Sequence, residues 1–264
     1  MAVTREAVIT IQQNAPLARE QGLNSVLAKA YALLGAFQHG PMTLRLSDLA
    51  QRSGVSKTSA YRLAEQLVEL GMLARTDHGY QLGMSMFEFG HRVPLSAALG
   101  ATARPILVDL ATTLRATVHL AVLDGLDVLY VEKINGRRGF HSVSSVGGRL
   151  SPTHSASGKV LLADSPMREA LLAGIEQRDG IGEHALAELR RELNRTESQR
   201  YGVERELIAR DWKCLAVPVP DRLGHTIAAL SALVPVTRND EQAILQHLRP
   251  AAGAIGRHVR HRSA

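Results

Sequence analysis

The stretch Leu46–Gly83, LSDLAQRSGVSKTSAYRLAEQLVELGMLARTDHGYQLG, changes its pattern three times. A short helical pattern ends at Gly54, a second begins after Ser56, and two short extended runs surround Asp77–Gly79. A glycine after a short helix permits the left-handed backbone that turns the chain into the next helix. The order of helix, tight turn, helix and hairpin predicts a winged helix-turn-helix, a fold that places its second helix in the major groove of DNA.

The second helix of this motif is predicted to carry the DNA contacts on one face. Ser56 is suited to cap it, and apolar residues at helical spacing predict a buried stripe on the opposite face: Ala60, Leu63, Leu67 and Leu70. From Ala50 to Ala64 there are three cations and no acid, which favours a polyanion. The predicted DNA-binding residues are Arg52, Ser56, Lys57, Thr58, Ser59, Tyr61, Arg62 and Arg75.

Simpler interpretations of this stretch remain. The motif could be an ordinary helical hairpin with a solvated polar face. Arg52 and Arg75 could be plain surface charges, and Tyr61 could pack against the first helix.

The chain as a whole fits an intracellular nucleic-acid binder. Its 264 residues carry a net charge of +6, which favours an anionic partner, and its one cysteine, Cys214, cannot form an internal disulfide. No signal peptide is recognised at the N-terminus, and no apolar run reaches the roughly 18–20 residues that span a bilayer. We therefore expect a cytoplasmic protein with no membrane association.

The pattern along the chain predicts an α+β protein in four parts. They are a flexible tail (1–22), the winged helix-turn-helix domain (23–83), a linker helix (84–94) and a second domain (95–264). In the second domain, β-branched alternation on both sides of Asp124-Gly125 predicts a hairpin, and GFHSVSSVGG (139–148) predicts a third strand. A later strand pair completes a predicted sheet of about five strands flanked by helices.

Several segments in order resemble the IclR family of bacterial transcriptional regulators, over about residues 23–260. They are SVLAKAYALLGAFQ, LRLSDLAQRSGVSKTSAYRLAEQLVELGMLAR, TVHLAVLDGLDVLYVEKI, PTHSASGKVLLA, YGVERE, KCLAVPVPD and IAALSALVP. The resemblance implies a winged helix-turn-helix, a linker helix and a GAF-like α/β domain that binds an effector and oligomerises. It also implies a homodimer or homotetramer that senses a small organic molecule.

The resemblance places the effector pocket around HSASGK and the last strands. Amide groups at a helix start bind carboxylates, so the backbone of Ser155, Ala156 and Ser157 is predicted to do so here. Three further residues match positions where the family has an acid, a cysteine and a serine facing the ligand: Glu204, Cys214 and Ser231. The chain departs from the family at Leu233, where a small polar residue is common, and at Asp211, where glycine is usual.

Each of these residues has a plainer interpretation. Cys214 could be a small buried hydrophobic residue, and Glu204 a solvated strand residue. His154 could bind a metal, although a loop histidine bonded to backbone is the simpler reading. No metal site and no cofactor are predicted.

The sequence thus predicts a ligand-responsive DNA-binding regulator, a repressor of a catabolic or metabolic operon that binds a double-stranded DNA operator and senses a carboxylic acid. One alternative is a constitutive DNA-binding protein whose C-terminal domain only oligomerises. Another is an enzyme built on the GAF-like domain. Against an enzyme, the chain has no nucleophile elbow, no HExxH zinc motif and no dinucleotide-binding fingerprint.

Overall fold

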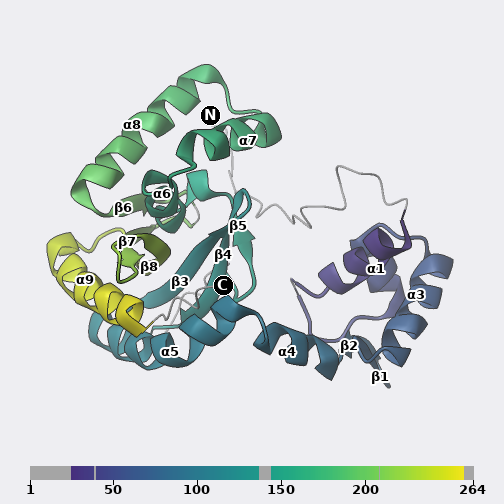
Figure 1. The fold of residues 1–264 in the computed structure, drawn as a ribbon. Helices are drawn as coiled ribbons and strands as arrows, with labels where there is room; N and C mark the ends of the chain where they lie inside the picture. The colour runs from purple at the N-terminus through teal and green to yellow at the C-terminus, as the bar shows by residue number, and fades with distance from the viewer. Residues whose placement is uncertain (1–24, 39, 137–143, 208, 259–264) are drawn as a thin grey trace, which may run out of the picture. The chain divides into compact units, whose positions relative to one another are not determined.

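The structure is a computed structural model that describes residues 25–38, 40–136, 144–207 and 209–258 (Figure 1). The chain divides into two compact units between Ala97 and Ala98. The tail predicted for residues 1–22 lies outside the described residues. In the ranges described, no helix combines the length and apolar character needed to cross a membrane.

The N-terminal unit is a winged helix-turn-helix, as predicted. Its elements are α1 (Val26–Gly35), α2 (Leu46–Ser53), α3 (Lys57–Glu69), β1 (Leu73–Thr76), β2 (Gly79–Leu82) and α4 (Met84–His91). Strands β1 and β2 form an antiparallel hairpin. Leu44 joins its edge through two backbone hydrogen bonds with Tyr80, of 2.9 and 2.8 Å. The hairpin is therefore tied to the chain segment that leads into α2.

Local chemistry accounts for the helix boundaries in this unit. The Ser25 hydroxyl accepts a hydrogen bond from the Ala28 N–H at 3.0 Å and begins α1. Gly54 ends α2 with φ of 69°, in the left-handed region that a turn between two helices requires. The core between the helices and the hairpin includes Leu33, Leu44, Leu49, Ala60, Leu63, Leu67, Leu73 and Tyr80.

The predicted buried stripe of α3 is wrong at one position. Leu70 is 65% exposed, because α3 ends at Glu69 and Leu70 is its C-terminal cap. Ala64, which is fully buried, extends the stripe instead.

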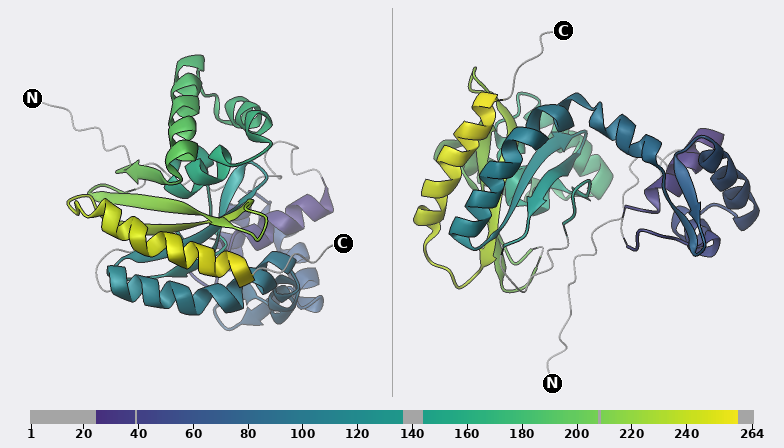
Figure 2. Two further views of the ribbon diagram at one scale, coloured as in Figure 1. Left: turned by 60° about the vertical axis from the view of Figure 1, so that its left-hand side comes forward. Right: turned by 90° about the horizontal axis from the view of Figure 1, so that it is seen from below.

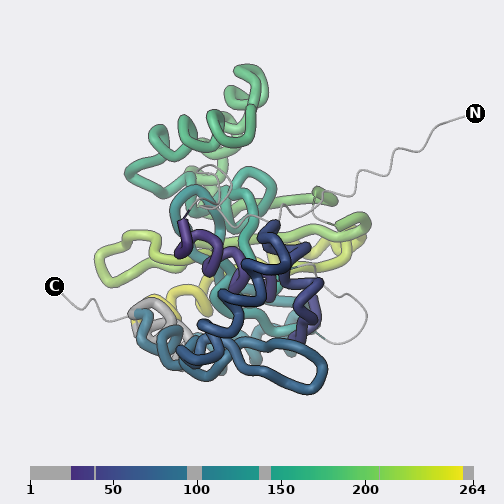
Figure 3. The backbone as a smooth tube through the Cα atoms, turned by 90° about the vertical axis from the view of Figure 1, so that its right-hand side faces the viewer, coloured from purple at the N-terminus to yellow at the C-terminus, as the bar shows by residue number. Residues whose placement is uncertain are grey.

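The C-terminal unit is built on one six-stranded antiparallel sheet. Its strands are β3 (Thr117–Asp124), β4 (Asp127–Ile134), β5 (Arg149–Leu150), β6 (Gly202–Arg205), β7 (Trp212–Pro220) and β8 (Thr226–Pro235). Their order is β5-β4-β3-β8-β7-β6, so the β3–β4 hairpin and the β7–β8 hairpin meet at the β3–β8 pair. Figure 3 draws the backbone as a tube coloured along the chain, in which β7 and β8 are yellow-green.

The third strand predicted at 139–148 is absent from the part of it that the structure describes, residues 144–148. Residues 137–143 lie outside the described residues, and Ser144–Gly148 is turn and irregular chain. The regular strand that pairs with β4 begins at Arg149, and just before it the backbone of Gly147 and Gly148 hydrogen-bonds Tyr130 of β4, at 2.8 and 3.0 Å. Two glycines, Gly147 (φ 79°) and Gly148, form a turn before it, which is incompatible with a continuous strand.

Helices cover both faces of the sheet (Figure 2). They are α5 (Pro94–Leu114), α6 (Ala156–Ala163), α7 (Arg168–Asp179), α8 (Glu183–Gln199) and α9 (Glu241–His258), with the short 3-10 helix η1 (Pro152–His154) before α6. In Figure 2, α5 and α9 lie side by side on one face, and α6 lies on the other with α7 and α8. The central strands are consequently buried on both faces; six consecutive residues of β3, from Thr117, are buried.

Candidate DNA-reading surface and effector site

The N-terminal end of α3 carries an exposed polar face without an acid in its first turn. Lys57 and Tyr61 lie one turn apart on it, as do Thr58 and Arg62, and all four side chains are exposed. The free N–H groups and the helix dipole make this end positive. The four residues form a surface suited to a phosphate backbone and to base edges.

The two serines at the start of α3 bond to each other. Ser56 occupies the N-cap position, but its hydroxyl hydrogen-bonds the Ser59 Oγ at 3.0 Å and makes no side-chain cap to the backbone. The predicted side-chain cap is therefore wrong, because the neighbouring hydroxyl takes its place. Ser56 is exposed and Ser59 half-buried, so both lie beside the face formed by α3.

The two remaining predicted contacts, Arg52 and Arg75, lie in different surroundings. Arg52 is exposed at the end of α2, with its guanidinium so close to Gly40 that a Cβ there would lie 2.5 Å from Nη1. Arg75, on β1, donates to Glu65 at 2.7 Å and to the Tyr80 hydroxyl at 3.0 Å. Because the Tyr80 hydroxyl also donates to Glu65 at 2.9 Å, these three residues tie the wing to α3.

The start of α6 forms the first part of the candidate effector site. Ser155 is its N-cap, and the Ser155 hydroxyl accepts from the Gly158 N–H at 2.9 Å. The N–H groups of Ala156 and Ser157 precede the first helical hydrogen bond, so a ligand oxygen can be their acceptor. Position 158 requires glycine, because a Cβ there would lie 2.2 Å from the carbonyl oxygen of Pro152 and would clash with it.

One face of the sheet forms the second part. Glu204 lies opposite Cys214 across the β6–β7 pair, and Ser231 lies opposite Ala216 across β7–β8. Cys214 and Ala216 are two residues apart, so all four share one face. The same face packs on α6, since Cys214 and Ala216 belong to one core cluster with Ala156, Val160 and Leu161.

The side chains on this face are buried. Glu204 is 2% exposed and accepts from the Leu207 N–H, which contradicts a solvated role for it. Burial, together with the nearby Glu204 carboxylate, raises the pKa of the Cys214 thiol to about 12, so the thiol stays neutral. The Ser231 hydroxyl interacts with the thiol and lowers that pKa, but no hydrogen bond of ordinary geometry joins it to any residue the structure describes.

Two residues of this face were missed by sequence reasoning. His119, on β3, lies directly opposite Ser231, and its ring centroid is 5.2 Å from that of Tyr130 on β4. Burial, with the charge of Lys133, lowers the pKa of His119 to about 3. Burial raises the pKa of Tyr130, as do Cys214 and Glu204 nearby. The sequence shows a histidine and a tyrosine among the apolar residues of a predicted strand pair, which could have marked them. It does not show the strand register that brings His119 opposite Ser231.

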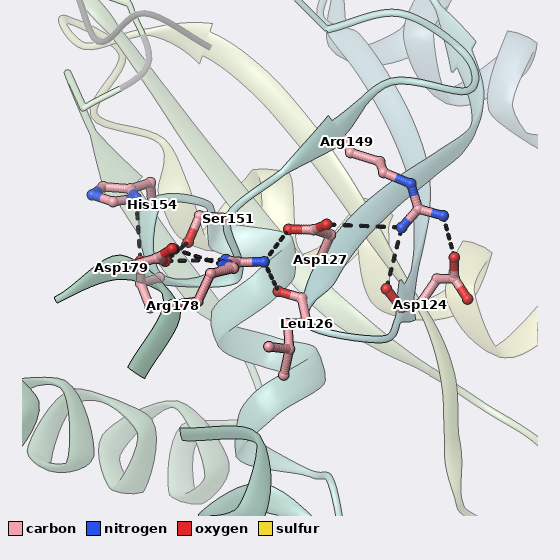
Figure 4. Close-up of polar contacts among 9 residues, drawn as sticks. Asp124, Leu126, Asp127, Arg149, Ser151, His154, Arg178 and Asp179 are labelled. Carbon is pink, nitrogen blue, oxygen red and sulfur yellow. Dashed lines mark hydrogen bonds and ion pairs between the residues drawn. The ribbon is translucent and has the colours of Figure 1, made fainter. Parts of the chain in front are cut away.

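An ionic cluster braces the loop before α6 (Figure 4). Arg178 of α7 bonds Asp127 at 2.7 Å and Asp179 at 2.7 Å. The Ser151 hydroxyl, on the loop that leads to η1, donates to Asp179 at 3.3 Å. Arg149 joins Asp124 to the same cluster. The cluster links the β3–β4 turn, α7 and the approach to α6.

His154 carries no metal-site geometry. Its Nδ1 lies 3.1 Å from the Thr153 hydroxyl. Across the described ranges, no three histidine, cysteine or acidic side chains gather in a way that could hold a metal ion.

Comparison with known proteins agrees with both units. Residues 26–77 match the IclR helix-turn-helix domain, and residues 92–259 match the bacterial transcriptional regulator IclR C-terminal family. The chain belongs to the IclR family. Family membership makes it a helix-turn-helix transcriptional regulator, and the predicted family and two-domain α+β fold are confirmed.

Three relatives show how far the similarity extends. The HTH-type transcriptional regulator XynR of Escherichia coli (strain K12) is 31% identical over 239 residues, 87% of this chain and 94% of XynR. The regulator KdgR of the same strain is 29% identical over 244 residues, 89% of this chain and 91% of KdgR. The crystal structure of an IclR homolog complexed with 4-hydroxybenzoate, from Microbacterium hydrocarbonoxydans, has a TM-score of 0.76 and 28% identity, and covers 88% of this chain and 98% of that one.

Proposed function

We propose that this IclR-family regulator is a repressor of a catabolic or metabolic operon, and that a small organic carboxylic acid bound in its C-terminal unit changes its affinity for operator DNA. The observation that carries the proposal is the buried polar face of β6, β7 and β8 packed against the start of α6. A relative of the same fold binds 4-hydroxybenzoate, an aromatic hydroxy acid, which supports this class of effector.

On the DNA side, α3 is proposed to enter the major groove with its N-terminal end. Lys57, at the first position of α3, meets a phosphate, and Arg62 reaches a guanine edge with both guanidinium donors. Thr58, Ser59 and Tyr61 lie between them on or beside the same face. Ser56 and Arg52 are proposed to contact the DNA backbone. Arg75 bonds Glu65 and so ties the wing to α3, and it does not contact bases.

On the effector side, the carboxylate is proposed to sit on the backbone amides at the start of α6, Ser155 to Ser157. Cys214 and Ser231 line the opposite wall, where both side chains are neutral hydrogen-bonding groups. Glu204, which would repel a carboxylate at close range, keeps its oxygen on the Leu207 N–H and faces away from the charged end of the effector.

The oligomer is proposed to be a homodimer through the N-terminal unit, paired again into a homotetramer. Helix α4, within the predicted linker 84–94, has no buried residue, and it exposes Met84 (71%), Phe87 (61%) and Phe89 (58%). Exposed apolar clusters of this kind mark interaction surfaces. A two-fold dimer also doubles the operator that one winged helix-turn-helix can read. Sedimentation should give a dimer or tetramer at micromolar concentration; a monomer with and without DNA would contradict this.

The effector proposal is tested by calorimetry and operator binding with a panel of carboxylic acids. An effector that weakens operator binding tenfold must itself bind about tenfold more weakly to the DNA complex, because the coupling is reciprocal. Ser155→Trp should fill the space before α6 and abolish effector binding. Ser155→Ala is the matched control, because it also removes the helix cap but fills no space.

Two outcomes would replace the proposal. If no acid in the panel changes the melting temperature or operator affinity, the C-terminal unit only oligomerises and the regulator is constitutive. If incubation with these metabolites yields turnover, the C-terminal unit is an enzyme, which its buried Cys214, His119 and Glu204 would then have to explain.

A further inference from the structure

Two buried polar atoms on the face that packs against α6 lack a hydrogen-bond partner among the described residues. They are Nδ1 of His119 and Oγ of Ser231. Their side chains are 3% and 1% exposed. A buried polar atom left unpaired costs about 1–3 kcal/mol, so a folded domain rarely keeps two side by side without a role for them.

The sheet register brings these two atoms together. His119 of β3 lies directly opposite Ser231 of β8. Residues opposite each other in an antiparallel pair point to the same face, with Cβ atoms about 5 Å apart. The neighbouring opposite pair on this face is Ala121 with Ala229, and both belong to the core cluster that includes Ala156 of α6. The unpaired atoms therefore face the layer that contains the start of α6.

We infer that His119 and Ser231 form a recognition pair for a hydroxyl group of the effector, which makes the effector a hydroxylated carboxylic acid. This inference rests on the proposed function, because it assigns the second end of the proposed effector. The carboxylate occupies the amides of Ala156 and Ser157, and the hydroxyl lies between the imidazole of His119 and the hydroxyl of Ser231.

The chemistry of the pair selects a hydroxyl over a second carboxylate. Nε2 of His119 lies 2.8 Å from the Ser144 hydroxyl, which leaves Nδ1 as the free nitrogen. A ligand hydroxyl both donates and accepts, so it satisfies Nδ1 in either tautomer and Ser231 at the same time. Neither group carries a charge, because burial keeps the imidazole neutral, so neither His119 nor Ser231 could pair as an ion with a second carboxylate.

The cation whose charge acts on His119, Lys133, is already engaged. Lys133 donates to the Ser144 backbone oxygen at 2.6 Å and so supports the serine that holds Nε2. The Tyr130 ring, 5.2 Å from the His119 ring, packs beside the pair and fixes its orientation. His119 thus has one nitrogen held by the protein and one available to a ligand.

The first test needs no effector. Ser231→Ala removes a hydroxyl that has no hydrogen-bond partner among the residues described, so the melting temperature of the ligand-free protein should be unchanged or higher. Thr226→Val is the matched control on the same strand, because the Thr226 hydroxyl donates to Asp164; it should lower the melting temperature by about 2–4 °C. If Ser231→Ala is as destabilising as Thr226→Val, the Ser231 hydroxyl has a structural partner and the inference is wrong.

The second test compares acids that differ only by a hydroxyl. Calorimetry with 4-hydroxybenzoate against benzoate, and 3-hydroxybutyrate against butyrate, should show about tenfold tighter binding of one hydroxylated member. Ser231→Ala should remove that preference without weakening the plain acid. His119→Phe, which keeps the ring beside Tyr130, should do the same.

The outcomes separate the two proposals. If hydroxylated and plain acids bind equally to the wild type, or if Ser231→Ala keeps the preference, the recognition pair is wrong while the acid effector stands. If none of the four acids binds, and none in the wider panel does, both proposals fail together.

Discussion

The two units of this regulator keep their polar chemistry in opposite places. In the N-terminal unit the Lys57, Thr58, Tyr61 and Arg62 side chains of α3 are exposed, whereas in the C-terminal unit His119, Cys214, Glu204 and Ser231 are buried. DNA approaches from outside, so its ligands can stay solvated until they are used. The small effector proposed here would be enclosed, so the groups that bind it would be buried beforehand, with their hydrogen bonds left for the effector.

The largest effect should come from the exposed face of α3. Arg62→Ala should weaken operator binding by roughly 1–3 kcal/mol and relax one operator position, because a bidentate guanine contact is lost. Lys57→Ala should weaken all sequences alike and lower the salt slope by about one. Gel-shift titrations at several salt concentrations measure both.

Arg249→Ala, on α9, is the control for that experiment, because it removes the same charge from an exposed position in the other unit. A Lys57→Ala, Arg62→Ala double variant that binds its operator as tightly as the wild type would show that α3 does not read the groove.

The buried face should instead show itself in the pH dependence of stability. The unfolded chain protonates His119 near its ordinary pKa of 6.5, whereas the folded protein holds it neutral down to about 3. His119 is therefore neutral in both states above pH 6.5 and does not lower the free energy of unfolding there. As the pH drops from 6.5 toward 3, only the unfolded chain binds the proton, so the free energy of unfolding falls, by about 2 kcal/mol at pH 5. Urea unfolding at pH 7 and pH 5 should show that His119→Phe loses about that much less than the wild type. Equal losses would mean that His119 is protonated in the fold.

A smaller effect is expected at Asp211, where the family usually has glycine. Asp211 has φ of 66°, in the left-handed region that disfavours a side chain with a Cβ. Asp211→Gly should therefore be more stable than Asp211→Ala by about 1 kcal/mol in chemical unfolding. If the alanine variant is the more stable of the two, the backbone at Asp211 is not left-handed in solution.

The smallest effect is expected at Arg75, which tests whether every cation of the N-terminal unit meets DNA. Because Arg75 bonds Glu65 and Tyr80, Arg75→Ala should leave the salt slope of operator binding unchanged. Glu65→Gln, which loosens the same contact without removing a cation, should give the same slope. If Arg75→Ala alone lowers the salt slope of operator binding by about one, Arg75 contacts a DNA phosphate after all.

The contrast between the units also explains what the sequence could predict. The turn at Gly54 and the polar face of α3 depend on residues a few positions apart, so their spacing alone predicts them. The Arg75 contact was missed because Glu65 and Tyr80 are brought to it by the hairpin rather than by helical spacing.

In the C-terminal unit, the resemblance supplied what spacing could not. The candidate effector residues lie at the start of α6 and on β6, β7 and β8, so no helical or strand spacing in the sequence joins them. They are Ser155, Glu204, Cys214 and Ser231. His119 escaped because its partner is set by the β3–β8 register, between strands about a hundred residues apart. In the described part of GFHSVSSVGG, residues 144–148, the predicted strand is wrong, because the two final glycines form a turn where the alternating pattern predicts extended chain.

The strand order β5-β4-β3-β8-β7-β6 has a consequence for the newly made protein. Thr117 of β3 finds its partner only at Leu233 of β8, near the end of the chain. A ribosome therefore releases the whole winged helix-turn-helix, whose contacts are local, long before the sheet can close. During that interval the nascent chain has a folded winged helix-turn-helix and an incomplete C-terminal sheet, in which the edge of β3 that pairs with β8 is still unpaired. A chain truncated before β8 would keep this state permanently, as a reader without its control and with a strand edge open to aggregation.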